Sequence, residues 1–111
     1  MPPKDAFASY CAELLSALGP VRVRRMFGGH GIYVDDLFIA IVVGETLYLK
    51  ADDQSLPRFE AAGCQPFSFT AKGRTMTTHY RAAPVDAMDS PALMRPWATL
   101  AIEAALRARA R

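Results

Sequence analysis

Arginine, glycine and histidine residues gather in one stretch of the chain, VRVRRMFGGHGIYVDD, which runs from Val21 to Asp36. Guanidinium groups form paired hydrogen bonds with carboxylates and phosphates, and glycine lets a backbone approach a ligand closely. The candidate contacts for a partner or an anion are Arg22, Arg24, Arg25 and His30. The chemistry that these residue types favour is therefore recognition of an acidic group.

The glycines of this stretch could in principle form a phosphate-binding loop. Such a loop lets successive backbone N–H groups converge on the anion at the start of a helix. The motif GGHG matches neither GxGxxG nor GxxxxGK[ST], and it leads into IYV, which is a strand pattern. We interpret Gly28, Gly29 and Gly31 as a structural loop, a bend or bulge at a strand junction; the functional alternative is that this bend presents His30.

Catalytic and metal-ligating patterns are not found in the sequence. His30 and His79 are the only histidines, and Cys11 and Cys64 have neither CxxC spacing nor a basic residue placed as in a nucleophile motif. We therefore expect no catalytic residues, no metal site and no cofactor, and a protein that is not an enzyme.

Size and charge limit the classes of protein to consider. The 111 residues are 51% apolar, enough for one core, and 13 basic against 11 acidic residues give a net charge of +2. This charge is too low for a protein that coats nucleic acid, so a nucleic-acid role would have to be local. The start of the chain lacks the apolar region of a signal peptide, and the longest apolar run, Leu37 to Val43, is too short to span a membrane. We expect one domain over residues 1–111, with a core of about 5–105 and a basic tail at 106–111, in a cytoplasmic protein that does not enter the membrane.

Hydrophobic periodicity and turn residues predict an α+β fold with the order helix, antiparallel meander, helix, two strands, helix. The first helix is expected over Asp5 to Leu18. A short helix is expected to end at Ala62, and a last helix to begin at Ser90 and Pro91 and to break or kink at Pro96. The strands are expected at Val21–Phe27, His30–Val34, Leu37–Val43, Thr46–Lys50, Phe67–Thr70 and Thr75–Arg81.

The middle strands are apolar on both faces if Asp35-Asp36 and Gly44-Glu45 form two-residue turns and the strands alternate regularly. One face then carries Tyr33, Phe38, Ala40, Val42, Leu47 and Leu49, and the other Ile32, Val34, Leu37, Ile39, Ile41, Val43 and Tyr48. Both faces must be covered, and helices suffice for one of them. A second copy of the chain is the simplest cover for the other, which predicts a homodimer.

Four stretches of the sequence resemble the TfoX N-terminal domain family, also called Sxy-like, which is related to bacterial regulators of competence for DNA uptake. They are GPVRVRRMFGGHGIYVDD, ETLYLKADD, FEAAGCQPF and MRPWA. The resemblance extends from about Asp5 to Ala105 and implies an α+β fold like that of secretion chaperones. The best-known regulators of this family carry a second, C-terminal domain and act at promoters with the cyclic-AMP receptor protein. The resemblance concerns only the first of the two domains of those regulators.

Three functions follow as hypotheses. The first is a non-enzymatic regulatory or adaptor module that works by protein contact, with a partner in the transcription machinery, through a sheet face or the arginine-rich edge. The second is a nucleic-acid accessory protein. Its contact residues would be Arg22, Arg24, Arg25, Lys72, Arg74 and the terminal arginines Arg107, Arg109 and Arg111. The alternative for the three terminal arginines is that they only oppose the dipole of the last helix. The third is a small-molecule binder or enzyme with a pocket beside Gly28 to Gly31 that uses His30, Tyr33 or His79.

Overall fold

The computed structural model describes residues 6–26 and 28–110 and has the α+β architecture that the sequence predicts. In chain order the elements are α1 (Ala6–Leu15), the 3₁₀ turn η1 (Ser16–Leu18), β1 (Val21–Met26), β2 (Gly29–Val34), β3 (Leu37–Val43), β4 (Thr46–Leu49), α2 (Leu56–Ala61), β5 (Pro66–Ala71), β6 (Arg74–Ala82), the 3₁₀ helix η2 (Val85–Asp89) and α3 (Pro91–Arg109). The predicted helix start at Asp5, the strand end at Phe27 and the terminal Arg111 lie outside the described residues.

All six strands form one antiparallel sheet in the order β1-β2-β3-β4-β6-β5. The predicted two-residue turns are confirmed, because Val34 pairs with Leu37 and Val43 with Thr46. Asp35 and Asp36 both have positive φ, 52° and 63°, a conformation that aspartate tolerates better than most residues and that matches the twist of a tight hairpin.

A β-bulge in β3 changes the sorting of side chains that regular alternation predicts. Tyr33 pairs with Phe38, but the next pair is Ile32 with Ala40, so Ile39 has no partner in β2. Ile39 and Ala40 are consecutive and both fully buried. The expected faces are therefore wrong from this point: Ala40, Val42, Leu47 and Leu49 join Ile32, Val34 and Leu37 on one face, and Ile41 and Tyr48 join Tyr33 and Phe38 on the other.

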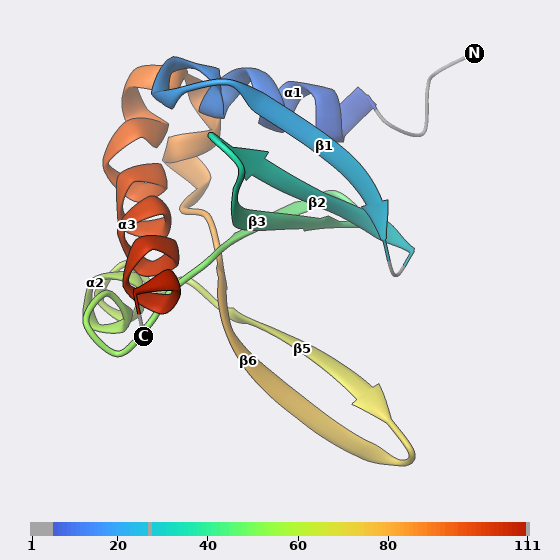
Figure 1. Cartoon of the computed structure of the whole chain (residues 1–111). Helices are drawn as coiled ribbons and strands as arrows, with labels where there is room; N and C mark the ends of the chain where they lie inside the picture. The colour runs from blue at the N-terminus through green and yellow to red at the C-terminus, as the bar shows by residue number, and fades with distance from the viewer. Residues whose placement is uncertain (1–5, 27, 111) are drawn as a thin grey trace.

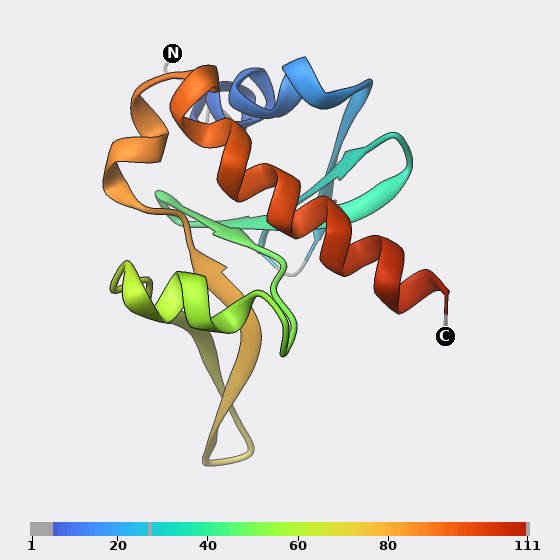
Figure 2. The same cartoon turned by 90° about the vertical axis from the view of Figure 1, so that its left-hand side faces the viewer.

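The first of these faces, which we call the inner face, packs against helices. Figures 1 and 2 show α1 and α3 on one side of the sheet, with α3 crossing the strands. Cys11 and Leu15 of α1 and Met94, Ala98 and Ala101 of α3 are buried there with the aliphatic side chains of the sheet. The aliphatic and small residues of this face form the core, which supplies most of the favourable free energy of folding.

The last helix continues through Pro96, so the helix does not break there as the sequence allowed. Ser90 caps α3 by accepting a hydrogen bond from the backbone N–H of Leu93 at 3.2 Å, and Pro91 occupies the first turn. Pro96 lies only six residues into the helix, where the loss of one backbone donor is offset by the packing of Met94 and Ala98 into the core. α3 extends to Arg109 and therefore includes residues 106–109 of the expected basic tail.

The β5–β6 hairpin extends beyond the rest of the sheet. β4 pairs with β6 only at Arg81 and Ala82, and the far half of the hairpin projects from the body as a two-stranded ribbon (Figure 1). Its turn, Lys72-Gly73, has positive φ at both residues, 53° and 75°. β5 therefore forms one edge of the sheet and β1 the other.

Candidate functional site

The outer face of the sheet, opposite the helices, is lined by aromatic rings. We call this surface the aromatic face; its residues are Tyr33, Phe38, Tyr48, Phe67 and Tyr80. All five are half-buried, in contrast to the fully buried aliphatic residues of the inner face. Among residues 6–26 and 28–110, no helix packs over it (Figures 1 and 2).

A row of rings crosses this face from β1 to β6 and has a cation at each end. The ring centroids of Tyr33 and Phe38 lie 5.0 Å apart in a stacked pair, and those of Phe38 and Tyr80 lie 6.1 Å apart. The Arg22 guanidinium lies 4.7 Å from the centre of the Tyr33 ring, and the Lys50 ammonium 5.5 Å from that of Tyr80. Cations held over ring faces are stabilised by the ring quadrupole, so the row is a built arrangement of positive charge and π surface.

A second aromatic cluster lies beside this row. Tyr48 contacts Phe67 at a centroid distance of 5.0 Å, and Phe67 contacts Phe69 at 6.1 Å. Burial raises the pKa of the Tyr80 phenol, with a further rise from the nearby Tyr33, so the Tyr80 ring carries no negative charge at neutral pH. The aromatic face thus presents ring surfaces with positive charge from Arg22 and Lys50 at its margin.

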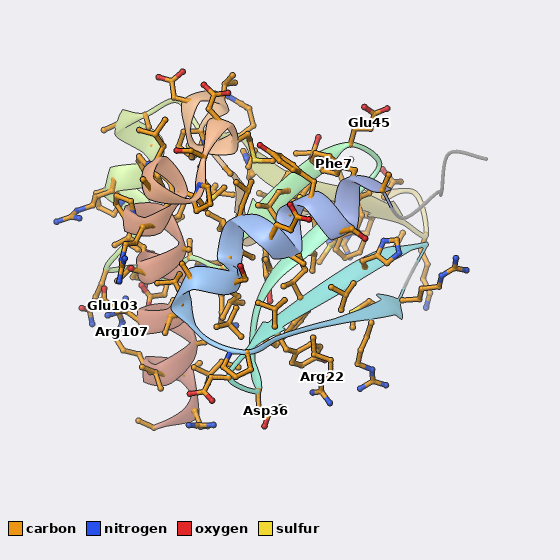
Figure 3. The ribbon with its side chains drawn as sticks, turned by 90° about the horizontal axis from the view of Figure 1, so that it is seen from above. Phe7, Arg22, Asp36, Glu45, Glu103 and Arg107 are labelled. Carbon is orange, nitrogen blue, oxygen red and sulfur yellow. The ribbon has the colours of Figure 1, made fainter. Side chains whose placement is uncertain are left out.

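The four predicted contact residues divide between the two sides of the sheet. Arg22 and Arg24 pair with Tyr33 and Gly31 and lie on the side of the aromatic face, whereas Arg25 and His30 pair with each other on the side of the inner face. Arg22 forms an exposed ion pair with Asp36, 3.6 Å away, at the margin of the sheet (Figure 3). The structure therefore places Arg22 and Arg24 on the side of the aromatic rings, where Arg22 contacts Tyr33, and Arg25 and His30 on the other side.

The three clustered glycines occupy different positions. Gly28 lies in the turn between β1 and β2 and has a φ of 76°. Gly29 and Gly31 lie within β2. A Cβ on Gly29 would stand 2.2 Å from the backbone oxygen of Val42, and one on Gly31 would meet the Met26 and Phe38 side chains at 2.6 and 2.8 Å. Gly31 thereby makes room for Met26 and Phe38 on the aromatic face.

The side chains considered for a small-molecule pocket are not brought together. Tyr33 is on the aromatic face, whereas His79 is on the other side of β6, 3.6 Å from the Asp53 carboxylate. His79 borders a small cavity of about 270 Å³ that is also lined by Lys50, Ala51, Ala104 and Ala108. Tyr33 and His79 therefore lie on opposite sides of the sheet, and the hypothesis of a pocket beside Gly28 to Gly31 that uses His30, Tyr33 or His79 stays a prediction.

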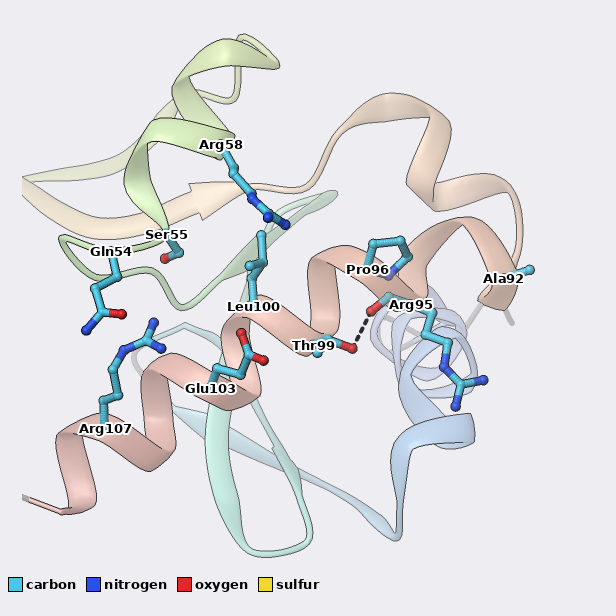
Figure 4. A pocket seen from close by; sticks show the side chains of 10 residues that line it. All are labelled: Gln54, Ser55, Arg58, Ala92, Arg95, Pro96, Thr99, Leu100, Glu103 and Arg107. Carbon is cyan, nitrogen blue, oxygen red and sulfur yellow. Dashed lines mark hydrogen bonds between the residues drawn. The ribbon is translucent and has the colours of Figure 1, made fainter.

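A larger groove, of about 600 Å³, lies between α2 and α3. Its walls include three arginines, Arg58, Arg95 and Arg107, together with Glu103. Figure 4 shows that Arg58 extends toward Leu100, whereas Arg95 points away from the groove. Since the guanidinium groups do not converge, the groove lacks the geometry of an anion site.

Arg107 has a structural contact that the sequence did not indicate. Its guanidinium donates two hydrogen bonds to the Asp52 carboxylate, at 2.6 and 2.9 Å, and so ties α3 to the segment before α2. Asp52 also accepts hydrogen bonds from the backbone N–H groups of Gln54 and Ser55, each at 3.1 Å. The bond from Arg107 is the main cause that holds the pKa of Asp52 down at about 2. The expectation that Arg107 only opposes the dipole of the last helix is therefore wrong, because Arg107 also binds Asp52.

The two thiols are poor nucleophiles in this environment. Burial raises the pKa of Cys11 to about 12, and burial also raises the pKa of Cys64, against the opposing effect of Arg81. Both side chains are therefore protonated thiols at neutral pH. Within the described part of the chain, no three His, Cys, Asp or Glu side chains are grouped as metal ligands, and no helix has the length and apolar character to cross a membrane.

The aromatic face could not be located from local sequence patterns. Its rings come from β2, β3, β4, β5 and β6, and Tyr33 and Tyr80 are far apart in the chain. The sequence contains two weak signals of this face. Arg22 and Arg24 alternate with apolar residues, and positions 33, 38 and 48 carry the aromatic residues Tyr33, Phe38 and Tyr48 rather than aliphatic ones. Neither indicates a shared surface until the bulge and the strand order are known.

Comparisons with known proteins find sequence similarity over most of the chain. The sequence model of the family described as TfoX N-terminal domain matches residues 13–105. The chain is 33% identical over 68 residues to the DNA transformation protein TfoX1 of Aliivibrio fischeri (strain ATCC 700601 / ES114). This similarity covers 61% of the chain and 32% of that protein, so the chain matches about a third of its relative's length.

Proposed function

Because the chain belongs to the TfoX N-terminal domain family, we propose that it is a non-enzymatic regulatory or adaptor module related to DNA transformation, and that it acts by protein contact through its aromatic face. The observation that carries this proposal is the asymmetry of the sheet. Two helices bury the inner face, while the outer face holds five half-buried aromatic rings, three of which form a row between Arg22 and Lys50.

The composition of the aromatic face favours a protein partner. Tyrosine, phenylalanine and arginine are enriched at the centres of protein interfaces, where large rigid side chains bury much area at little cost in conformational entropy. Contacts among the Tyr33, Phe38 and Tyr80 rings hold these side chains in place before a partner arrives, which reduces the cost of binding. We place this partner in the transcription machinery, within the process of DNA transformation for which the similar Aliivibrio fischeri protein is named.

The same surface also supports a second candidate, an accessory role in binding single-stranded nucleic acid. Rings on an open sheet can stack on unpaired bases, and Arg22, Arg24 and Lys50 could neutralise phosphates beside them. Fluorescence anisotropy with a labelled oligonucleotide distinguishes this candidate, since such binding would weaken steeply as salt rises.

A transformation assay in the native cell tests the leading proposal. A strain that lacks the gene is complemented with the wild type, with Arg22→Glu, or with Tyr33→Ala/Phe38→Ala. Both variants are expected to lower the transformation frequency by about tenfold or more, because truncating or reversing a central contact costs at least that much affinity. Arg95→Ala, on the far side of the molecule, is the matched control and should complement fully. Full complementation by both face variants at wild-type protein levels would refute the proposal.

A further inference from the structure

The β5–β6 hairpin has an open strand edge, since β5 is the last strand of the sheet, and it carries exposed apolar side chains. Phe69 of β5 and Met76 of β6 pair across the hairpin, and their exposed fractions are 45% and 48%. Beyond the base of β6, the ribbon has only two strands and no helix behind it (Figures 1 and 2). A two-stranded ribbon is only marginally stable in water by itself, so this arm gains from an added strand.

The two edges of the sheet differ in charge. β1 carries Arg22, Arg24 and Arg25, and self-pairing along it would place like charges opposite one another. β5 reads PFSFTA and has no charged residue over its whole length, whereas charged side chains are one of the ways in which proteins protect an exposed edge. The bulge at Phe67 leaves Ser68 to Ala71 as the regular part of this edge.

We propose that β5 is a dimerisation edge that pairs antiparallel with β5 of a second copy of this chain. The neutral sequence of β5 permits self-pairing, whereas the arginines of β1 disfavour it. Phe69 lies within the regular part of the edge, and β-branched Thr70 beside it also suits a strand. Antiparallel addition at a sheet edge supplies backbone hydrogen bonds, and the neighbouring side chains supply specificity.

Symmetry fixes the geometry of this pairing. Paired residues of antiparallel strands point to the same side, so a two-fold axis between two identical strands must be perpendicular to the sheet and must relate a residue to its own copy. An axis at Phe69 places the two Phe69 rings in a cross-strand pair. It also puts both aromatic faces on the same side of one continuous sheet. The inference is independent of the proposed function, because it is tested on the purified chain without any other partner.

Disulfide trapping tests the pairing directly. Residues that face one another across antiparallel strands have Cα atoms about 4.5–5.5 Å apart, within the range of a disulfide. Phe69→Cys is therefore expected to form a covalent dimer under mild oxidation at least about tenfold faster than Val23→Cys on the other edge, since only the first places two thiols in contact. Val23 is a matched control because it is similarly exposed, and the native Cys11 and Cys64 are both buried.

Sedimentation equilibrium provides the second readout. The wild-type chain should associate reversibly to a dimer as its concentration rises, and Phe69→Lys should weaken this association by about tenfold through the lost ring pair and the added like charges. Circular dichroism verifies that Phe69→Lys, at an exposed position, remains folded. A wild type that stays monomeric up to about 0.5 mM, or equal cross-linking rates for the Phe69→Cys and Val23→Cys variants, would overturn the proposal.

Discussion

Gly29→Ala is expected to destabilise the protein by about 3 kcal/mol, at the upper end of the usual cost of overpacking. The added Cβ would lie 2.2 Å from the backbone oxygen of Val42, a fixed atom in the central strand β3. Relief of this contact requires β2 and β3 to separate, which weakens their hydrogen bonds and disturbs the packing of Val42, which is almost fully buried. Urea denaturation of the purified variant measures the loss.

Gly31→Ala is the matched comparison, two residues further along the same strand. Its Cβ would meet the Met26 methyl group at 2.6 Å and the edge of the Phe38 ring at 2.8 Å. Methionine can change rotamer, so this substitution should cost clearly less than Gly29→Ala. If both substitutions cost the same, or if Gly29→Ala is harmless, the conclusion that Gly29 is needed for close approach of the strands is wrong.

Asp52→Ala is expected to destabilise the protein by about 2 kcal/mol at neutral pH, because it removes a turn cap and a pair of charge-assisted hydrogen bonds. The Asp52 carboxylate accepts from Gln54, Ser55 and Arg107, and little of its side chain is exposed. Asp53→Ala is the control, since the Asp53 side chain is 96% exposed and should contribute almost nothing. Equal losses for the two neighbours would contradict the assigned role of Asp52.

Acid titration should reveal the same contact. Folding lowers the pKa of Asp52 from its ordinary value of 3.8 to about 2, chiefly through the hydrogen bond from Arg107. A lowered pKa means that the stabilisation is complete above the unfolded value and is lost as the carboxylate becomes protonated in the fold. The difference in unfolding free energy between the wild type and Asp52→Ala should therefore be constant above about pH 5 and should shrink between about pH 4 and pH 2.

Local patterns predicted the elements well, because the features that define them are local. The aspartates of the Asp35-Asp36 turn and the Ser90-Pro91 start of α3 act within a few residues of themselves. The bulge at Ile39 is different. It is stabilised by the burial of two consecutive apolar side chains, Ile39 and Ala40, beneath the helices, and nothing in the run LFIAIVV distinguishes it from regular alternation.

The candidate site depends on contacts between distant segments, which explains why it was only partly predicted. Arg22 and Arg24 were identified because a strand places alternate residues on one side. Tyr80 and Lys50 reach the same surface only because β6 is inserted next to β4, and Arg107 meets Asp52 across 55 positions of sequence. Arg25 and His30 were included because they are neighbours in sequence, and the strands direct them to the other side.

The sheet therefore has two apolar faces that differ in side-chain type and in burial. Aliphatic and small side chains on the inner face pack tightly against α1 and α3 and stabilise the fold. Aromatic rings on the outer face are only half-buried and are held in place by one another and by Arg22 and Lys50. This difference is the physical basis for assigning partner contact to the outer face.

Site-specific photo-cross-linking in the native cell tests the contact role of the aromatic face most directly. Tyr33 is replaced by a benzoyl-substituted phenylalanine, which keeps an aromatic ring on the face, and Leu93, an exposed residue of α3, receives the same group as a control. We expect irradiation to give a discrete protein adduct from position 33 and none from position 93. Equal labelling from both positions, or no protein adduct from position 33, would contradict the assignment of this face as the contact surface.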